Sequence, residues 1–156
     1  MSSHQNPIGF LIVDVARLMR LSFDRALAVA GVGGLTPGEA RALAHVDRCG
    51  AVRQTLLAQR MAIEPMTLVG YLDRLEAQGL VAREPDPTDR RAKIVRLTPG
   101  AEPVLARILE VGREVRAVAL AGMSEAEADQ FLALLERAHR NLASGRDGAD
   151  DVENAT

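Results

Sequence analysis

Hydrophobic side chains recur at helical spacing over the first thirty residues of the chain. In residues 8–30 they fall three or four positions apart, which predicts one amphipathic helix of about six turns. Glycines at positions 31, 33 and 34 follow this helix. Because they follow a helix and not a strand, they predict a helix end and a linker, not a phosphate-binding loop. The stripe consists of Ile8, Leu11, Ile12, Val15, Leu18, Met19, Ser22 or Phe23, Ala26 and Val29.

Two further stripes of this kind lie towards the other end of the chain. Thr98 and Pro99 begin a predicted helix over about 99–121, and the capping box of Ser124 and Glu127 begins another over about 125–143. The expected inward positions are Val104, Leu105, Ile108, Leu109, Val111, Val115 and Val118 in the first helix, and Phe131, Leu132, Leu135, Ala138 and Leu142 in the second.

Shorter helices are predicted for the central segment. Thr36 and Glu39 form a capping box that begins a helix over about 36–48. A short helix over 52–60, a break, and a longer helix over 65–79 follow. Two short helices separated by a tight break are typical of a helix-turn-helix. The expected inward positions of the three helices are Ala40, Leu43, Ala44 and Val46; Leu56, Leu57 and Met61; and Leu68, Leu72 and Leu75.

The pattern then changes to that of a β-hairpin. Residues 80–83 and 93–97 read as two short strands, and the segment between them contains two prolines and three acids, which exclude a helix interior. Arg90 and Arg91 lie near the predicted tip. The fold expected is therefore mainly α with a small β-hairpin wing.

This reading divides the chain into four parts. Residues 36–98 form a winged helix-turn-helix core, residues 1–35 and 99–144 supply N- and C-terminal dimerisation helices, and residues 145–156 form a disordered acidic tail. Each flanking apolar stripe needs a partner, and a second copy of the chain would cover what remains exposed. We therefore expect a two-fold homodimer that presents two recognition helices about 34 Å apart, as a pseudo-palindromic DNA site requires.

Composition narrows the class of protein. A chain of 156 residues with 47% hydrophobic and 26% charged residues is long enough to bury a core without metals or disulfides. The single cysteine, Cys49, excludes a disulfide framework within one chain, and a structural or incidental thiol is the expected role. No signal peptide and no membrane-spanning run is predicted, so the cytoplasm is the expected location.

The net charge of −2 does not exclude a nucleic-acid partner, because the charge is distributed unevenly along the chain. Residues 145–156 carry −3, which leaves +1 for residues 1–144, and 18 of the 19 basic residues are arginine. Arginine is well suited to phosphate and base-edge contacts.

Two segments resemble the MarR family of transcriptional regulators. The run from Asp86 to Thr98, with Asp89-Arg90-Arg91 at its tip and a closing Leu-Thr, is similar to the family's wing signature. Leu57-Ala58, Thr67, residues 72–76 (Leu-Asp-Arg-Leu-Glu) and residues 79–83 (Gly-Leu-Val-Ala-Arg) are similar to its turn, recognition helix and first wing strand. The resemblance covers about residues 8–143.

The resemblance implies a DNA-binding site. Arg90 or Arg91 would enter the minor groove and Asp89 would brace that arginine. Alternatively, the two arginines are a solvated turn tip. The base-facing front of the recognition helix and the expected phosphate contacts are Pro65, Met66, Thr67, Gly70 and Tyr71, with Arg53 and Arg74.

Some of these positions have a structural alternative or depart from the family pattern. Arg74 could be an exposed charge paired with Asp73 or Glu76, and Tyr71 could be a half-buried surface aromatic. Family members usually carry a small hydroxyl residue and then a basic residue where this chain has Val69 and Gly70. Met66 and Val69 could meet thymine methyl groups, with Gly70 allowing close approach, or readout could have moved to the wings.

The resemblance also implies a small ligand, commonly an aromatic acid, between the dimerisation helices and the winged domain. An anion in an apolar pocket needs a cation. Arg17 and Arg20 on the first helix and Arg41 or His45 on the second are the candidates, with ordinary surface charges or a structural histidine as the alternative.

The function expected is that of a ligand-responsive, DNA-binding regulator, most often a repressor. A winged-helix protein-interaction module without DNA binding is the alternative. No catalytic residues, metal ligands or cofactor motifs are predicted, because the three histidines are far apart and no nucleophile or phosphate-loop motif occurs.

Overall fold

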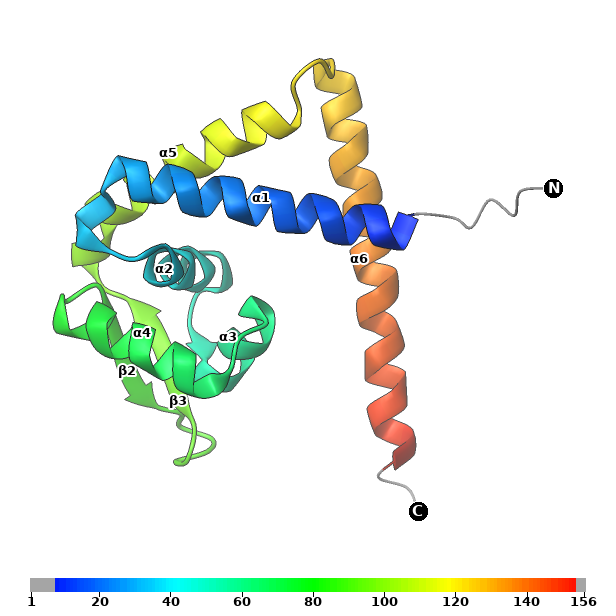
Figure 1. Ribbon diagram of the computed structural model, residues 1–156. Coiled ribbons are helices and arrows are strands. Elements are labelled where there is room, and N and C mark those ends of the chain that lie inside the picture. The colour runs from blue at the N-terminus through cyan, green and yellow to red at the C-terminus, as the bar shows by residue number, and fades with distance from the viewer. Residues whose placement is uncertain (1–7, 154–156) are drawn as a thin grey trace. The chain divides into compact units, whose positions relative to one another are not determined.

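The computed structural model describes the backbone of residues 8–153 and the side chains of residues 8–144. The chain divides into two compact units, residues 1–117 and 118–156, which are described separately. The first unit contains α1 (Ile8–Ala30), α2 (Pro37–Cys49), α3 (Gln54–Met61), α4 (Pro65–Ala77), three strands, and α5 (Glu102–Ala119), which ends just beyond its boundary. A mainly helical fold with a small wing is confirmed (Figure 1).

Helix α1 has the predicted bounds but not a buried stripe. Leu27 is its one buried residue among those described. Phe23, Ala26 and Ala30 pack partly against the core, whereas Val29 is 90% exposed. A row of large apolar side chains is exposed in its first fourteen positions: Ile8, Phe10, Leu11, Ile12, Val13, Val15, Leu18, Met19 and Leu21. The predicted stripe therefore lacks cover within this chain.

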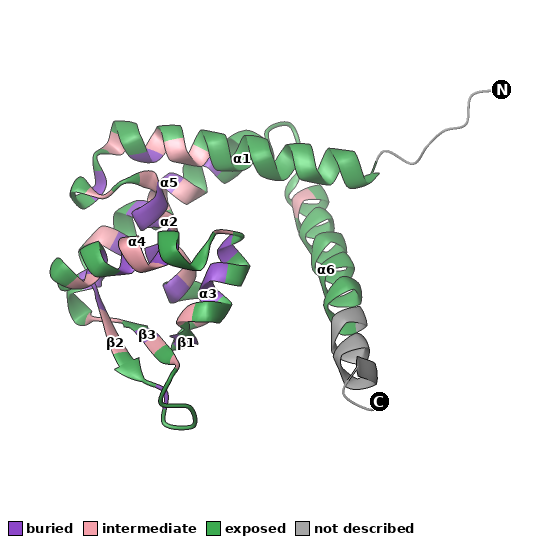
Figure 2. Cartoon of the chain, turned by 60° about the horizontal axis from the view of Figure 1, so that its bottom comes forward, coloured by how far each residue is buried: buried purple, intermediate pink, exposed green. Residues whose placement is uncertain are grey.

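The core lies where α2, α3, α4, α5 and the sheet meet, and Figure 2 shows the buried residues gathered there. Leu68, Leu72 and Leu75 of α4 are fully buried, as their i, i+4, i+7 spacing predicts. Each such leucine contributes about 1.5–3 kcal/mol by leaving water. Other fully buried members are Leu43, Val46, Leu57, Val95 and Ile108, whereas the predicted Leu56, Leu109 and Val118 are exposed.

The sheet has three antiparallel strands in the order β1 (Val52–Arg53), β3 (Lys93–Leu97), β2 (Val81–Pro85). The β2–β3 hairpin is confirmed. The prediction that residues 52–53 are helical was wrong, because Val52 pairs with Val95 of β3 and its side chain is buried. Helix α3 begins only at Gln54.

Local chemistry fixes the ends of the central helices. The predicted capping box of α2 is present: Thr36 Oγ1 accepts from the Glu39 backbone N–H at 3.3 Å, and Glu39 Oε2 accepts from the Thr36 N–H at 2.9 Å. Helix α3 ends at Met61 and is capped by Ala62, which adopts the left-handed conformation with φ +51°. Helix α4 then begins at Pro65, in the first turn of the helix, where a proline is well tolerated.

The flanking C-terminal helices differ slightly from prediction. Pro99–Ala101 form a 3-10 turn before α5. In the second unit, Ser124 and Glu127 form the predicted capping box of α6 (Glu125–Glu153). The predicted end at about residue 143 was wrong, because no proline interrupts the chain there. The predicted disordered tail is helical in its backbone as far as Glu153, and residues 154–156 lie outside the described residues.

No helix within residues 8–153 is both long and apolar enough to cross a bilayer.

Candidate nucleic-acid interface

A buried carboxylate organises the tip of the wing. Asp86 follows β2, is 4% exposed, and accepts hydrogen bonds from the Thr88 N–H at 2.8 Å and the Thr88 hydroxyl at 2.7 Å. Its second oxygen accepts from Arg53 Nε at 2.6 Å. The bonds from Thr88, and then the Arg53 guanidinium, lower the pKa of Asp86 to about 2. This residue was missed as a site residue, although Asp followed two positions later by Thr is the signature of an Asx turn.

Arg53 ties the wing to the helix-turn-helix. It precedes α3, and besides its bond to Asp86 its Nη2 donates to the Thr88 hydroxyl at 3.0 Å. The side chain remains half exposed. The contacts of Arg53 with Asp86 and Thr88 anchor the wing, and a phosphate contact of Arg53 stays a prediction.

The two arginines of the tip project into solvent. Within the described chain, neither the Arg90 nor the Arg91 guanidinium has a hydrogen bond or an ion pair, and both residues are exposed. Asp89 braces the loop through the backbone: its Oδ1 accepts from the Arg91 N–H at 3.0 Å and not from a guanidinium.

The front of α4 is open to solvent. Pro65, Met66 and Thr67 are exposed, Met66 to 78%. Val69 and Gly70 are half-buried one turn further on, and a Cβ added to Gly70 would meet no atom within 4 Å. A shallow hollow of about 460 Å³ connects this end of α4 to α3, with Thr55, Gln59 and Glu64 among its lining residues.

Tyr71 packs between helices. Its ring lies over Gly38 of α2, where an added Cβ would be 2.5 Å from the ring Cζ and the hydroxyl oxygen. The residue is half-buried against the core, as the structural alternative for this position expects.

Arg74 pairs with a residue that the sequence did not suggest. Its Nε donates to Glu39, which is 2% exposed on α2, while the Arg74 side chain stays 59% exposed. The alternative pairing with Asp73 or Glu76 was wrong, because both carboxylates bind Arg83 of β2 at 2.6 Å. The hydrogen bonds from Arg83 lower the pKa of Glu76. Glu39 therefore both closes the capping box of α2 and pairs with Arg74 of α4.

The four predicted ligand-binding residues are not brought together in one cavity. Arg17 pairs with Asp14 at 3.1 Å, Arg41 pairs with Asp24, and Arg20 is exposed.

His45 is half-buried beside cationic neighbours. Burial first, and then the charges of Arg48, Arg41 and Arg60, lower its pKa. Arg60 also donates to Cys49 Sγ at 2.7 Å.

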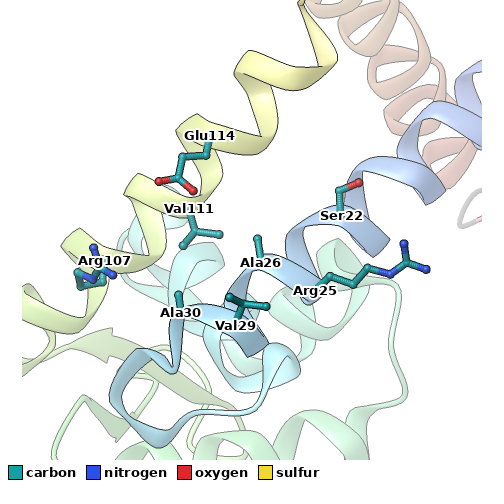
Figure 3. A pocket seen from close by; sticks show the side chains of 8 residues that line it. All are labelled: Ser22, Arg25, Ala26, Val29, Ala30, Arg107, Val111 and Glu114. Carbon is teal, nitrogen blue, oxygen red and sulfur yellow. The ribbon is translucent and has the colours of Figure 1, made fainter.

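A cavity of about 470 Å³ lies instead between α1 and α5. Figure 3 shows the side chains of Ala26, Val29, Ala30 and Val111 between the two helices, so that the cavity is largely apolar. The polar residues at its edge are Ser22, Arg25, Arg107 and Glu114.

A helix-turn-helix followed by an arginine-tipped hairpin defines a winged-helix protein. Residues 35–93 match the model of the MarR family. Over these residues the chain is similar to this family, as the resemblance of its wing and recognition helix implies.

Solved structures share this fold over nearly the whole chain. A crystal structure of MarR is 24% identical, with a TM-score of 0.75, and the match covers 94% of this chain and 98% of that one. A MarR-family regulator from Silicibacter pomeroyi is 27% identical, with a TM-score of 0.72 and coverage of 86% and 88%. A mutant MarR from E. coli complexed with operator DNA is 22% identical, with a TM-score of 0.63 and coverage of 85% and 94%.

Proposed function

We propose that this regulator binds double-stranded DNA through α4 and the wing and represses transcription by occupying an operator. The observation that carries the proposal is the wing tip, where Arg90 and Arg91 are held on an ordered loop yet have no partner within the described chain. An exposed arginine without a protein partner is free to contact a phosphate or a narrow minor groove. The mutant MarR of similar fold that was crystallised with operator DNA supports this use of the fold.

The exposure of these side chains supports the following contacts. The front of α4 (Pro65, Met66 and Thr67) enters the major groove, and Arg90 or Arg91 enters the adjacent minor groove. More than half of the Arg74 side chain is exposed, so Arg74 can contact a phosphate while it keeps its ion pair with Glu39.

We propose a homodimer as the DNA-binding unit. The exposed apolar row of α1 is too large for a monomer surface in water, and a second copy is a partner that is always present. Two-fold symmetry would present two copies of α4 to two half-sites about 34 Å apart.

We propose that release from DNA depends on a small ligand in the cavity between α1 and α5. Its apolar walls suit an aromatic ring, and Arg107 at its edge offers a cation to a carboxylate. Such a ligand can weaken DNA binding only through unequal affinity for the free and DNA-bound forms.

The DNA-binding test uses the purified protein and labelled duplexes from its own upstream region and from a random-sequence selection. Dissociation constants are measured at several salt concentrations for the wild type and for Arg90→Ala/Arg91→Ala. We expect tight binding that weakens with salt, with a log–log slope of about −0.9 per neutralised phosphate. The double variant should bind more weakly and with a shallower slope.

Lack of binding to any duplex at low salt would overturn the proposal and favour a winged-helix protein-interaction module. Circular dichroism of the double variant provides the folding control. Both arginines are exposed and unpaired, so their replacement should leave the fold intact.

The ligand test compares benzoate with benzamide, which has a similar shape and no charge. We expect benzoate to raise the DNA dissociation constant, and Arg107→Gln to remove this effect. Arg20→Gln, which replaces an exposed arginine outside the cavity lining, is the matched control. Equal effects of the two compounds would refute a carboxylate site.

A further inference from the structure

The exposed face at the front of α4 has an unusual chemistry for a helix that reads DNA. Its first seven residues, Pro65 to Tyr71, contain no arginine, lysine, asparagine or glutamine. These are the side chains that form bidentate hydrogen bonds with guanine or adenine in the major groove. The adjoining Glu64 can accept a hydrogen bond from cytosine but cannot donate one to a purine.

What this face offers instead is apolar surface. Met66 is 78% exposed at the second position of the helix. Val69 lies three residues further on, hence on the same side of the helix, and is half exposed. The open space around Gly70 leaves no side chain to hold the helix away from the groove.

We infer that this regulator selects its DNA by contact of Met66 and Val69 with the 5-methyl groups of thymines in each half-site. The thymine methyl is the one apolar group that a base pair presents in the major groove. The inference rests on the proposed DNA-binding function and specifies which bases that site reads.

The patch is too small to serve as a protein-docking surface. Met66 is its only large and strongly exposed apolar side chain, whereas protein interfaces need a continuous apolar area of several hundred Å². Its setting favours nucleic acid: α3 borders the same hollow as Pro65, and Arg53, directly before α3, is bonded to the wing loop that carries the unpaired arginines. A thymine methyl fits both the size of the patch and this setting.

The experiment removes single methyl groups from the DNA. Thymines in the tightest selected duplex are replaced one at a time by deoxyuridine, which lacks only the 5-methyl group, and the dissociation constant is measured at fixed salt. Burial of one methyl group predicts about fourfold weaker binding at one or two positions in each half-site. Replacement of thymines outside the two half-sites is the control and should have no effect on the dissociation constant.

Protein variants complete the test. Met66→Ala should weaken binding to the thymine duplex and abolish the difference between thymine and deoxyuridine at the positions concerned. Met66→Leu should preserve that difference, since leucine also offers an apolar contact.

The inference is overturned if sequence-specific binding survives every deoxyuridine substitution within twofold, or if the selected half-sites lack thymine. It is also overturned if Met66→Ala weakens both duplexes equally. In each case the proposed DNA-binding function would stand. Absence of salt-sensitive binding to any duplex would instead remove that function.

Discussion

Ala62 is the one residue other than glycine that has a positive φ in the described part of the chain. A left-handed conformation costs an L-residue about 1–2 kcal/mol, partly because the Cβ crowds the following carbonyl. Glycine avoids this cost but loses more entropy on folding. Ala62→Gly should therefore raise the free energy of unfolding by about 0.5–1 kcal/mol, as urea denaturation would measure.

Ala106→Gly is the matched control for this substitution. Ala106 is exposed in the interior of α5, where glycine should lower the free energy of unfolding by about 1 kcal/mol. A loss of stability in both variants would show that the turn before α4 is not strained.

Asp86 gives the wing a dependence on acid. Because its pKa is lowered from 3.8 to about 2, the carboxylate stabilises the folded state above about pH 4, and this contribution disappears as the pH falls towards 2. The difference in free energy of unfolding between the wild type and Asp86→Asn should thus be constant from pH 7 to pH 5 and shrink by pH 2. Parallel pH curves for the two proteins would contradict this role.

At the scale of elements, sequence patterns succeed where the determinants are local. The stripe of α4 and the capping boxes of α2 and α6 depend on residues three or four positions apart, and the structure contains them as predicted. Strand β1 was missed because a strand of two residues is too short to show the alternation of apolar and polar side chains. Its partner, Val95, also lies in a distant segment of the sequence.

Partners of charged side chains were equally beyond prediction. Arg74 has acidic neighbours along its own helix, yet its partner Glu39 comes from α2. The packing of two helices brings these residues together, and no spacing within one helix reveals it. Arg53 and Asp86 are likewise far apart in the sequence, and their ion pair connects the wing to the helix-turn-helix.

Arg53 should therefore act through the wing and not through a phosphate. In Arg53→Ala, the amide hydrogens of Asp86 and of residues 88–92 should exchange faster, because Asp86 and Thr88 lose their bonds to the helix-turn-helix. DNA affinity should fall while the salt slope stays unchanged, whereas loss of a phosphate contact would reduce the slope by about 0.9. A reduced slope with unchanged exchange would assign Arg53 to the phosphate backbone.

At the scale of the whole molecule, the apolar row of α1 is exposed in the single chain. The predicted burial of this stripe therefore requires a second copy of the chain. Leu11 is 60% exposed in the middle of this row. If the row forms the dimer interface, Leu11→Glu places two carboxylates in it by symmetry and should convert the dimer to monomers at micromolar concentration. Sedimentation velocity measures this directly.

Arg17→Gln is the control for the dimer test, since it alters an exposed residue on the same helix without burying a charge. A wild-type protein that sediments as a monomer, or a Leu11→Glu variant that remains dimeric, would show that α1 does not mediate dimerisation.

A rigid two-fold dimer also predicts how DNA affinity depends on the spacing of half-sites. Two copies of α4 can enter successive major grooves only on one face of the duplex, about one helical turn apart. Insertion of five base pairs between the half-sites turns them to opposite faces, so affinity should fall towards that of a single half-site. Insertion of ten base pairs restores the face but lengthens the span by about 34 Å, which a rigid dimer cannot follow. Equal affinity for all three duplexes in a binding titration would mean that each winged domain acts alone. In that case, the wing arginines and Met66 would have to supply the entire specificity from one half-site.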